Sequence, residues 1–214
     1  MRRAACALMM TLCLMLSGCG GQATDEVDQL TLDIRGEYLA LDRVTAQMEV
    51  GADYGRRVYA YTMELDWQRE GDTTVTVTAP ETVAGITARI SAGETFLEYD
   101  GVSLETGPLD ESGLSPVGAG IFLMKAATEG FIAESGFEML EERDCLRLLC
   151  RDPEGTPGEG TECTLWFDKD THDLMRGEIS TDGQRVIECT FTSFVREKTT
   201  GEGNIEGPNI DSEA

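Results

Sequence analysis

The residues with the clearest chemistry lie near the start of the chain and end on a cysteine. Arg2 and Arg3 precede an uncharged, mostly apolar run over residues 4–15. The tetrapeptide Leu16-Ser17-Gly18-Cys19 follows and places small residues directly before a thiol. A signal peptidase needs small residues before the bond that it cleaves, and a diacylglyceryl group needs a thiol acceptor. We therefore predict cleavage before Cys19 and lipid modification of its sulfur.

The length of the apolar run favours a signal peptide over a membrane span. Residues 4–15 fall well short of the roughly 20 apolar residues that a bilayer-spanning helix needs. An uncleaved anchor and a plain secretory signal are the alternatives. We expect residues 1–18 to be removed, and residues 19–25 to form a lipidated tether on the extracytoplasmic face of the cell membrane.

The charge of the chain excludes one class of partner. It has 17 basic and 40 acidic side chains, a formal net charge of −23. Such a surface repels phosphates, so we expect no nucleic acid as a partner. It also repels anionic lipid head groups, so membrane attachment would depend on the acyl chains of Cys19. The acidic residues could form a solvated surface or attract a basic partner, and composition does not choose between these.

Four cysteines remain after the signal peptide and the lipidated residue are set aside: Cys145, Cys150, Cys163 and Cys189. An even number in an exported chain permits two disulfides in three connectivities. Cys145 and Cys150 are an odd number of positions apart on one predicted strand, so they face opposite sides and cannot pair. Cys150 and Cys163 flank a loop and could form a disulfide across a hairpin. Buried free thiols are the alternative.

The sequence offers no metal or catalytic motif that is complete. The segment from Asp168 to Asp173 begins like a calcium loop, but it lacks the glycine at its sixth place and has Ile179 where the closing glutamate belongs. We predict a hairpin turn there. His172 is the only histidine, so a histidine-rich zinc site is excluded within one chain. The segment around Ser115 departs from G-x-S-x-G because it ends in valine. We expect neither an enzyme nor a cofactor.

The periodicity of apolar residues changes once near the start of the mature chain. Apolar residues at steps of three and four from Val27 to Leu41 predict a helix with Thr24 as its N-cap. Alternation then predicts strands with one buried face, interrupted by one helical insert with Ser115 as N-cap and Pro116 at its first position. The predicted strands lie near residues 44–50, 59–67, 75–77, 86–90, 97–99, 102–104, 137–151, 162–168, 174–180 and 185–194.

This order of elements predicts an α+β fold that is mainly antiparallel β. No β-α-β alternation appears, so a parallel sheet is not expected. About nine to eleven strands would make one curved sheet, an incomplete, half-open β-barrel, and its apolar face must be covered. The N-terminal helix and the helical insert supply that cover. We expect one domain over residues 26–197, followed by a disordered acidic tail over residues 198–214.

Several short motifs together resemble the LolA/LolB-like lipoprotein carrier superfamily. The residues that carry the resemblance are Trp67-x-Arg69-x-Gly71-Asp72, Pro80, Ala84-Gly85-Ile86, Tyr99-Asp100-Gly101, Ser115-Pro116, Phe167-Asp168-x-x-Thr171, Glu178-Ile179-x-x-Asp182-Gly183, Phe191 and Phe194. The resemblance implies an incomplete antiparallel barrel that is closed by helices and whose apolar hollow takes acyl chains. The lipobox is nearer to the membrane-anchored members than to the soluble periplasmic carriers. Some lipoproteins of spore-forming bacteria share this fold and bind a cell-wall enzyme.

Alternate side chains of a half-barrel face its inside, which identifies candidate ligand-lining residues. These are Met63, Leu65, Trp67, Val75, Val77, Ile86 and Ile90 on strands, with Ile121 and Phe122 from the insert. They could line a cavity for a lipid or an acyl chain, or pack on one another and on the helices and leave no void. The leading hypothesis is a membrane-anchored protein that binds or carries an apolar ligand. The alternative is an interaction module that binds an envelope or cell-wall enzyme through its sheet or its acidic surface.

Overall fold

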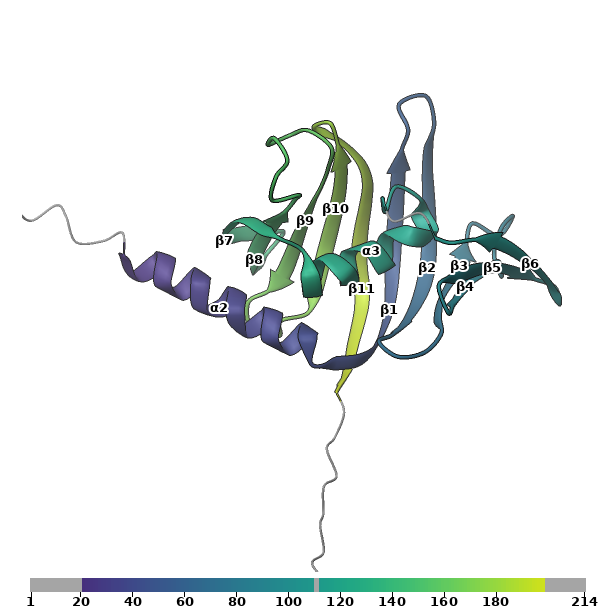
Figure 1. Ribbon diagram of the computed structural model, residues 1–214, viewed down its shortest axis with the longest axis horizontal. Helices are drawn as coiled ribbons and strands as arrows, with labels where there is room; N and C mark the ends of the chain where they lie inside the picture. The colour runs from purple at the N-terminus through teal and green to yellow at the C-terminus, as the bar shows by residue number, and fades with distance from the viewer. Residues whose placement is uncertain (1–20, 110–111, 199–214) are drawn as a thin grey trace, which may run out of the picture.

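The computed structural model describes residues 21–109 and 112–198. The predicted signal peptide, Cys19 and residues 199–214 of the predicted tail lie outside these residues. The described elements, shown in Figure 1, are α2 (Gly21–Leu39), β1 (Leu41–Asp53), β2 (Val58–Gln68), β3 (Thr73–Ala79), β4 (Thr87–Ser91), β5 (Glu94–Tyr99), β6 (Val102–Gly107), α3 (Pro116–Glu129), β7 (Ile132–Leu140), β8 (Arg143–Cys150), β9 (Thr161–Asp168), β10 (Leu174–Thr181) and β11 (Gln184–Lys198).

All eleven strands form one sheet with the order β6-β5-β4-β3-β2-β1-β11-β10-β9-β8-β7. Every described pairing is antiparallel, and the sheet does not close, because β6 and β7 stand at its two ends. The first and last strands, β1 and β11, pair at its centre and join the two halves. The predicted half-open α+β fold is confirmed.

The central strands show how alternation produces one buried face. Along β1, Val44, Ala46, Met48 and Val50 are all buried, and polar residues separate them. A strand directs successive side chains to opposite faces, so the apolar set lies together on the concave face and the polar set on the convex face.

The helix α2 places part of its predicted apolar stripe in the core. Ile34 and Tyr38 are buried, and Val27 and Leu30 are partly buried against the same cluster. The helix begins at Gly21, so Thr24 lies inside it and is not its N-cap. The helix therefore starts before the apolar periodicity does. That periodicity marks only the part of the helix that packs against the core.

The helix α3 crosses the concave face, as Figure 1 shows. Its predicted start is confirmed: the Ser115 side chain accepts a hydrogen bond from the Gly118 N–H, and Pro116 occupies the first turn. The helix packs on β1, β2, β9 and β11 and touches α2. Both helices thus cover the side of the sheet to which the apolar residues point.

One predicted strand is wrong. The segment predicted as one strand over residues 137–151 is a hairpin of β7 and β8, and β7 begins at Ile132, before the predicted start. The turn falls at Glu141, whose φ is +57°. Glu141 and Glu142 carry none of the glycine or proline signals that mark other turns of this sheet, so the apolar run reads as continuous.

Neither α2 nor α3, the two helices within the described residues, is both long and apolar enough to pass through a bilayer.

Candidate functional site

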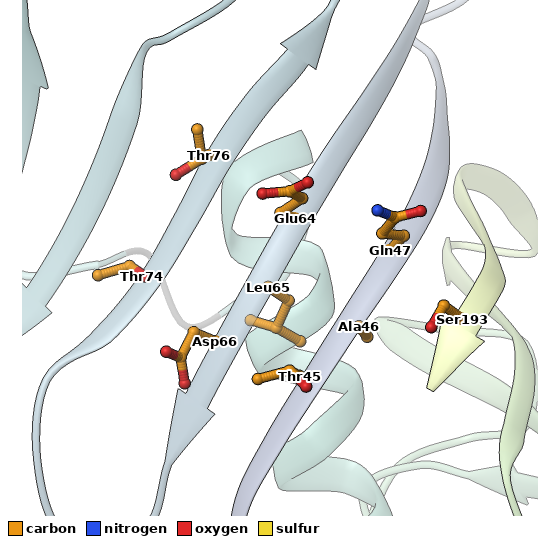
Figure 2. A pocket seen from close by; sticks show the side chains of 9 residues that line it. All are labelled: Thr45, Ala46, Gln47, Glu64, Leu65, Asp66, Thr74, Thr76 and Ser193. Carbon is orange, nitrogen blue, oxygen red and sulfur yellow. The ribbon is translucent and has the colours of Figure 1, made fainter. Parts of the chain in front are cut away.

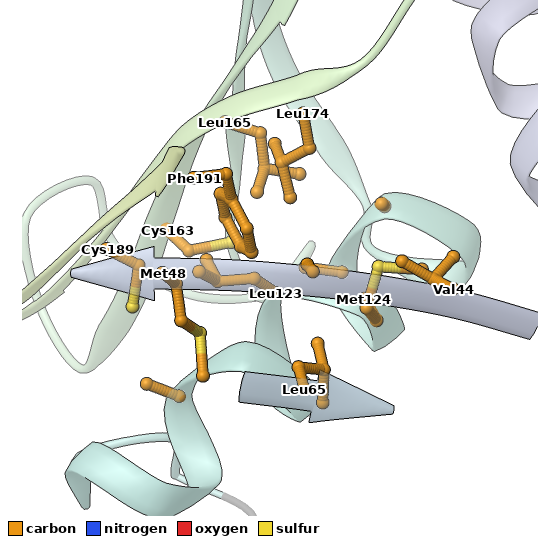
Figure 3. Packing of buried hydrophobic residues seen from close by; sticks show 14 of the residues in the cluster. Val44, Met48, Leu65, Leu123, Met124, Cys163, Leu165, Leu174, Cys189 and Phe191 are labelled. Atoms are coloured by element: carbon orange, nitrogen blue, oxygen red, sulfur yellow. The ribbon is translucent and has the colours of Figure 1, made fainter. Parts of the chain in front are cut away.

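The centre of the concave face is a packed core. Figure 3 shows Leu123 and Met124 of α3 among the side chains of the sheet, including Met48 and Leu65. Leu123 and Met124 have no exposed surface, and neither has Met48. Four of the predicted ligand-lining residues belong to this cluster and are 0–5% exposed: Met63, Leu65, Val75 and Val77. In this arrangement they have no surface to offer a ligand.

The other five predicted residues lie around this core and remain half-buried. Trp67, Ile121 and Phe122 pack against the cluster from β2 and α3. Ile90 belongs to β4, and Ile86 directly precedes that strand. The structure therefore brings the predicted residues of the strands and of the insert to one side of the sheet. The side chains of α3 fill the space over the centre of that side.

An apolar pocket of about 320 Å³ opens beside the C-terminal end of α3. It is lined by Phe122, Lys125, Ala126, Glu129, Gly130, Phe131, Cys150, Arg151, Asp152, Thr161 and Cys163. Its apolar floor comes from α3, from Phe131 and from the facing ends of β8 and β9. The charged side chains among these residues, of both signs, surround that floor. We call this the α3 pocket.

Only Phe122 of the α3 pocket was among the residues predicted to line a ligand site. The sequence shows Phe131 and the two cysteines as apolar, but it does not show that the end of α3 meets the ends of β8 and β9. The contact joins segments distant along the chain. Arg35 of α2 also holds the C-terminal end of α3, because its Nη2 donates a hydrogen bond of 2.8 Å to the Gly130 carbonyl.

Two thiols form one wall of this pocket. Cys150 of β8 is the direct register partner of Cys163 of β9, and all four described cysteines are free and buried. A hydrogen bond between the two thiols lowers the pKa of Cys150 and, together with burial, raises the pKa of Cys163. Arg35 also favours the thiolate of Cys150 by its positive charge. The positive charge of Arg35 therefore favours a thiolate in this pair.

The convex face carries a different, polar depression of about 420 Å³. In Figure 2, α3 lies behind the sheet, Leu65 points toward it, and Glu64 and Gln47 stand on the opposite face. Asp66 on this face is held by Arg43 through two hydrogen bonds of 2.7 and 2.8 Å. Threonine and serine hydroxyls supply most of the remaining lining. The lining of this depression is mainly polar, so it is a poorer site for an apolar ligand than the α3 pocket.

The Asp168–Asp173 segment is a turn between β9 and β10 that holds α2 in place. The Asp168 carboxylate accepts hydrogen bonds from the Asp170 and Thr171 N–H groups, which stabilises the turn. His172 lies 3.1 Å from the Glu37 carboxylate, and the Tyr38 hydroxyl donates to the His172 carbonyl. Across the residues that the structure describes, no group of three or more histidine, cysteine or acidic side chains is placed to hold a metal ion.

Comparison with known proteins gives similarity of structure without similarity of sequence. No family model matches the chain, and no curated protein matches it. Solved structures do. An uncharacterised conserved protein from Thermus thermophilus has a TM-score of 0.48 at 12% identity, over 86% of this chain and 95% of that chain.

Two further similar structures are those of a LolA superfamily protein and of a lipoprotein. A LolA superfamily protein from Nitrosomonas europaea has a TM-score of 0.41 at 10% identity, over 81% of this chain and 94% of that chain. The lipoprotein LppX from Mycobacterium tuberculosis has a TM-score of 0.43 at 17% identity, over 78% of this chain and 95% of that chain. The open eleven-stranded sheet and the two helices on its concave face agree with the fold that the LolA-like resemblance implies.

Proposed function

We propose that this protein is a membrane-anchored, extracytoplasmic lipoprotein without enzymatic activity that binds an amphiphile with an acyl chain. The α3 pocket carries this proposal. In this pocket an apolar floor and charged side chains of both signs come together around free volume. Binding sites for small molecules combine these two features, with the apolar part supplying affinity and the polar groups orientation.

The size and chemistry of the α3 pocket fit part of an acyl chain. Burial of each methylene contributes roughly 0.8 kcal/mol, so a chain segment of several carbons would bind measurably. Lys125 and Arg151 line the pocket and would pair with the head group of an anionic amphiphile, while Glu129 and Asp152 keep the charge of the lining balanced. The predicted lining residues beneath α3, Met63 and Leu65 among them, would join the site only if α3 moved away from the sheet.

The experiment uses a soluble version that starts at Gly21 and therefore lacks Cys19. Native mass spectrometry would show whether it emerges with a bound lipid, and displacement of a fluorescent fatty acid would give its affinity. We expect saturable binding to one site. A protein that emerges empty and refuses fluorescent fatty acids would contradict the proposal.

A matched pair of variants tests the location. Phe131 is 51% exposed at the α3 pocket, and Met139 is 63% exposed on β7 outside it. Phe131→Ser should weaken fatty acid binding severalfold, because it removes an apolar wall, whereas Met139→Ser should leave it unchanged. Equal affinities of the two variants would exclude this pocket as the site.

The filled centre of the concave face favours a second candidate function, that of an interaction module. A core without a hollow has no room for a whole lipid, so the surface of the sheet would be the binding site for a partner. The partner would be an envelope protein, such as a cell-wall enzyme, that meets the sheet or the acidic surface. Co-purification of one such partner, with an affinity that falls as salt rises, would support this function over ligand binding.

A further inference from the structure

One row of apolar side chains runs from the covered centre of the sheet to its open end. Leu65, Val75, Ala88, Leu97 and Leu104 are successive register partners across β2 to β6. The first three are at most 2% exposed, whereas Leu97 is 37% and Leu104 is 62% exposed. The concave face therefore continues past its cover.

A second exposed pair lies beside this row. Tyr99 is the register partner of Val102, and the two are 58% and 69% exposed. Each stands two positions from Leu97 or Leu104 on the same strand, so all four side chains share one face. Figure 1 shows β4, β5 and β6 extending beyond the end of α3. We call the concave surface of these three strands the β4–β6 wing.

The strand at the rim of this surface has an open edge. β6 is the outermost strand of the sheet and pairs only with β5 among the described strands. Edge strands are normally protected by lysine, by proline or by a covering element. β6 contains neither lysine nor proline, and five of its six residues are exposed. Its outward N–H and C=O groups can therefore pair with another strand.

The surroundings of the β4–β6 wing are acidic. The acidic residues between residues 69 and 109 are Glu70, Asp72, Glu81, Glu94, Glu98, Asp100 and Glu105. Both arginines of this segment are already engaged. Arg89 pairs with Glu98 and Asp72, and Arg69 donates to the carbonyls of Leu41 and Tyr38. A partner of this surface would therefore carry basic residues around an apolar centre.

The position of the β4–β6 wing argues against the membrane as its cover. Figure 1 shows the start of α2 and the wing at opposite ends of the long axis of the molecule. The 19 residues of α2 alone extend about 28 Å, at 1.5 Å per residue. With the proposed anchor just ahead of α2, the wing faces away from the lipid and toward other envelope proteins.

We propose that the β4–β6 wing docks an extended, basic segment of a partner protein. The segment adds a strand to the edge of β6 and lays its alternate apolar side chains on Leu97 and Leu104. Backbone pairing gives affinity, the leucines select apolar residues at every second position, and the acidic rim selects lysine or arginine between them. This proposal deepens the interaction-module function and is independent of ligand binding in the α3 pocket.

The test uses a fluorescein-labelled ten-residue peptide of alternating valine and lysine, with a glutamate-for-lysine peptide beside it. The mature protein is held in phosphatidylcholine nanodiscs, and empty nanodiscs give the blank. Fluorescence anisotropy should show saturable binding of the lysine peptide, weaker at higher salt, and none of the glutamate peptide. The double variant L97T/L104T should bind at least about tenfold more weakly.

Val58→Thr is the matched control, because Val58 is a 71% exposed apolar strand residue outside the wing. It should bind like the unchanged protein, and thermal melts should show that all variants are folded. Equal binding by L97T/L104T would overturn the proposal, since the peptide would then be responding to net charge alone. Self-association that the double variant abolishes would also overturn it, because a second copy would occupy the wing.

Fatty acid affinity, measured in parallel on the soluble version, separates the two functions. If L97T/L104T loses the peptide and keeps the fatty acid, the wing and the α3 pocket are two sites, as proposed. If fatty acid binding is absent from every variant while the peptide still binds, the ligand-binding function fails and the docking proposal stands.

Discussion

Gly177 of β10 lies directly beneath Leu123 of α3, and a Cβ at position 177 would clash with the Leu123 Cδ1 atom. Leu123 is fully buried, so it has no free space into which to retreat. The closeness of α3 to the sheet therefore depends on the missing side chain at position 177. A similar contact occurs at Gly120, where a Cβ would lie 3.0 Å from Met48 Cε.

Substitution of this glycine should loosen the cover of the concave face. Gly177→Val forces α3 outward, and overpacking of this kind costs about 1–3 kcal/mol of unfolding free energy. Urea unfolding followed by tryptophan fluorescence measures the loss. Gly136→Ala is the control, since nothing lies within 4 Å of its Cβ position. Equal stabilities of the two variants would mean that α3 is not held against β10.

Oxidation should join Cys150 to Cys163 and no other pair. The two are register partners, whereas Cys145 lies an odd number of positions from Cys150 on β8 and faces the other side. Mild oxidation removes one proton and one electron from each thiol and forms the disulfide, with diamide as the oxidant. Peptide mapping without reduction identifies the bridge. The closed loop should add up to about 3 kcal/mol of stability.

The remaining thiols provide the internal control for that experiment. Burial raises the pKa of Cys189 to about 12, so its thiolate is scarce at neutral pH and its alkylation should be slow. Burial also raises the pKa of Cys145. A bridge that includes Cys145 or Cys189 would show that the register of β8 and β9 is different from the one described.

Acid should weaken the turn that holds α2. Burial acts to raise the pKa of Asp168, but the N–H groups of Thr171 and Asp170 and the Arg143 guanidinium outweigh it, so the pKa is lowered. A carboxylate with a lowered pKa stabilises the fold above its ordinary pKa of 3.8, and this contribution is lost as pH falls through the lower, folded value.

Asp168→Asn should therefore be less stable than the unchanged protein at pH 7. The difference should shrink as the pH falls below about 4, because the unchanged protein then loses the same interaction. Urea midpoints at the two pH values give the comparison. A difference that grows toward low pH would have the opposite sign and would reject the role given to the Asp168 carboxylate.

Membrane attachment should depend on Cys19 alone. Cys19→Ser removes the thiol that would accept the diacylglyceryl group, and a chain with a net charge of −23 is repelled by anionic lipids. We expect the unchanged protein to resist carbonate washing of membranes and to require detergent, and the variant to leave the membrane fraction. An unchanged protein that washes off without detergent would refute the anchor.

The sequence predicts the sheet well, because alternation is a local property. The two-residue turn Asp182-Gly183 has φ values of +51° and +75°, and aspartate followed by glycine is typical of such hairpin turns; Ser115 caps α3 as predicted. The turn at Glu141 escaped detection, since glutamate carries no preference for positive φ. The turn at Asp182-Gly183 was thus found because its residue types are typical of a hairpin turn, and the turn at Glu141 was missed because its residue types are not.

The site was harder to predict, because its geometry comes from contacts between distant segments. Apolar alternation identified Met63 and Leu65 as inward-facing, but it does not distinguish a packed interior from a hollow one. The glycines at 120 and 177 make the difference, because they allow α3 to approach the sheet closely. The pairing of Cys150 with Cys163 could be predicted from the strand pattern. The α3 pocket could not, because it depends on where the end of α3 lies relative to β8 and β9.

The most direct test of ligand binding is photo-crosslinking with a fatty acid that carries a diazirine in its acyl chain. Mass spectrometry of the labelled peptides locates the chain. We predict saturable labelling on the segment that contains Phe122, Ala126 and Phe131 and on the facing ends of β8 and β9, with competition by unlabelled fatty acid. Labelling that does not saturate, or that lies on the convex face around Glu64, would contradict a lipid site beside α3.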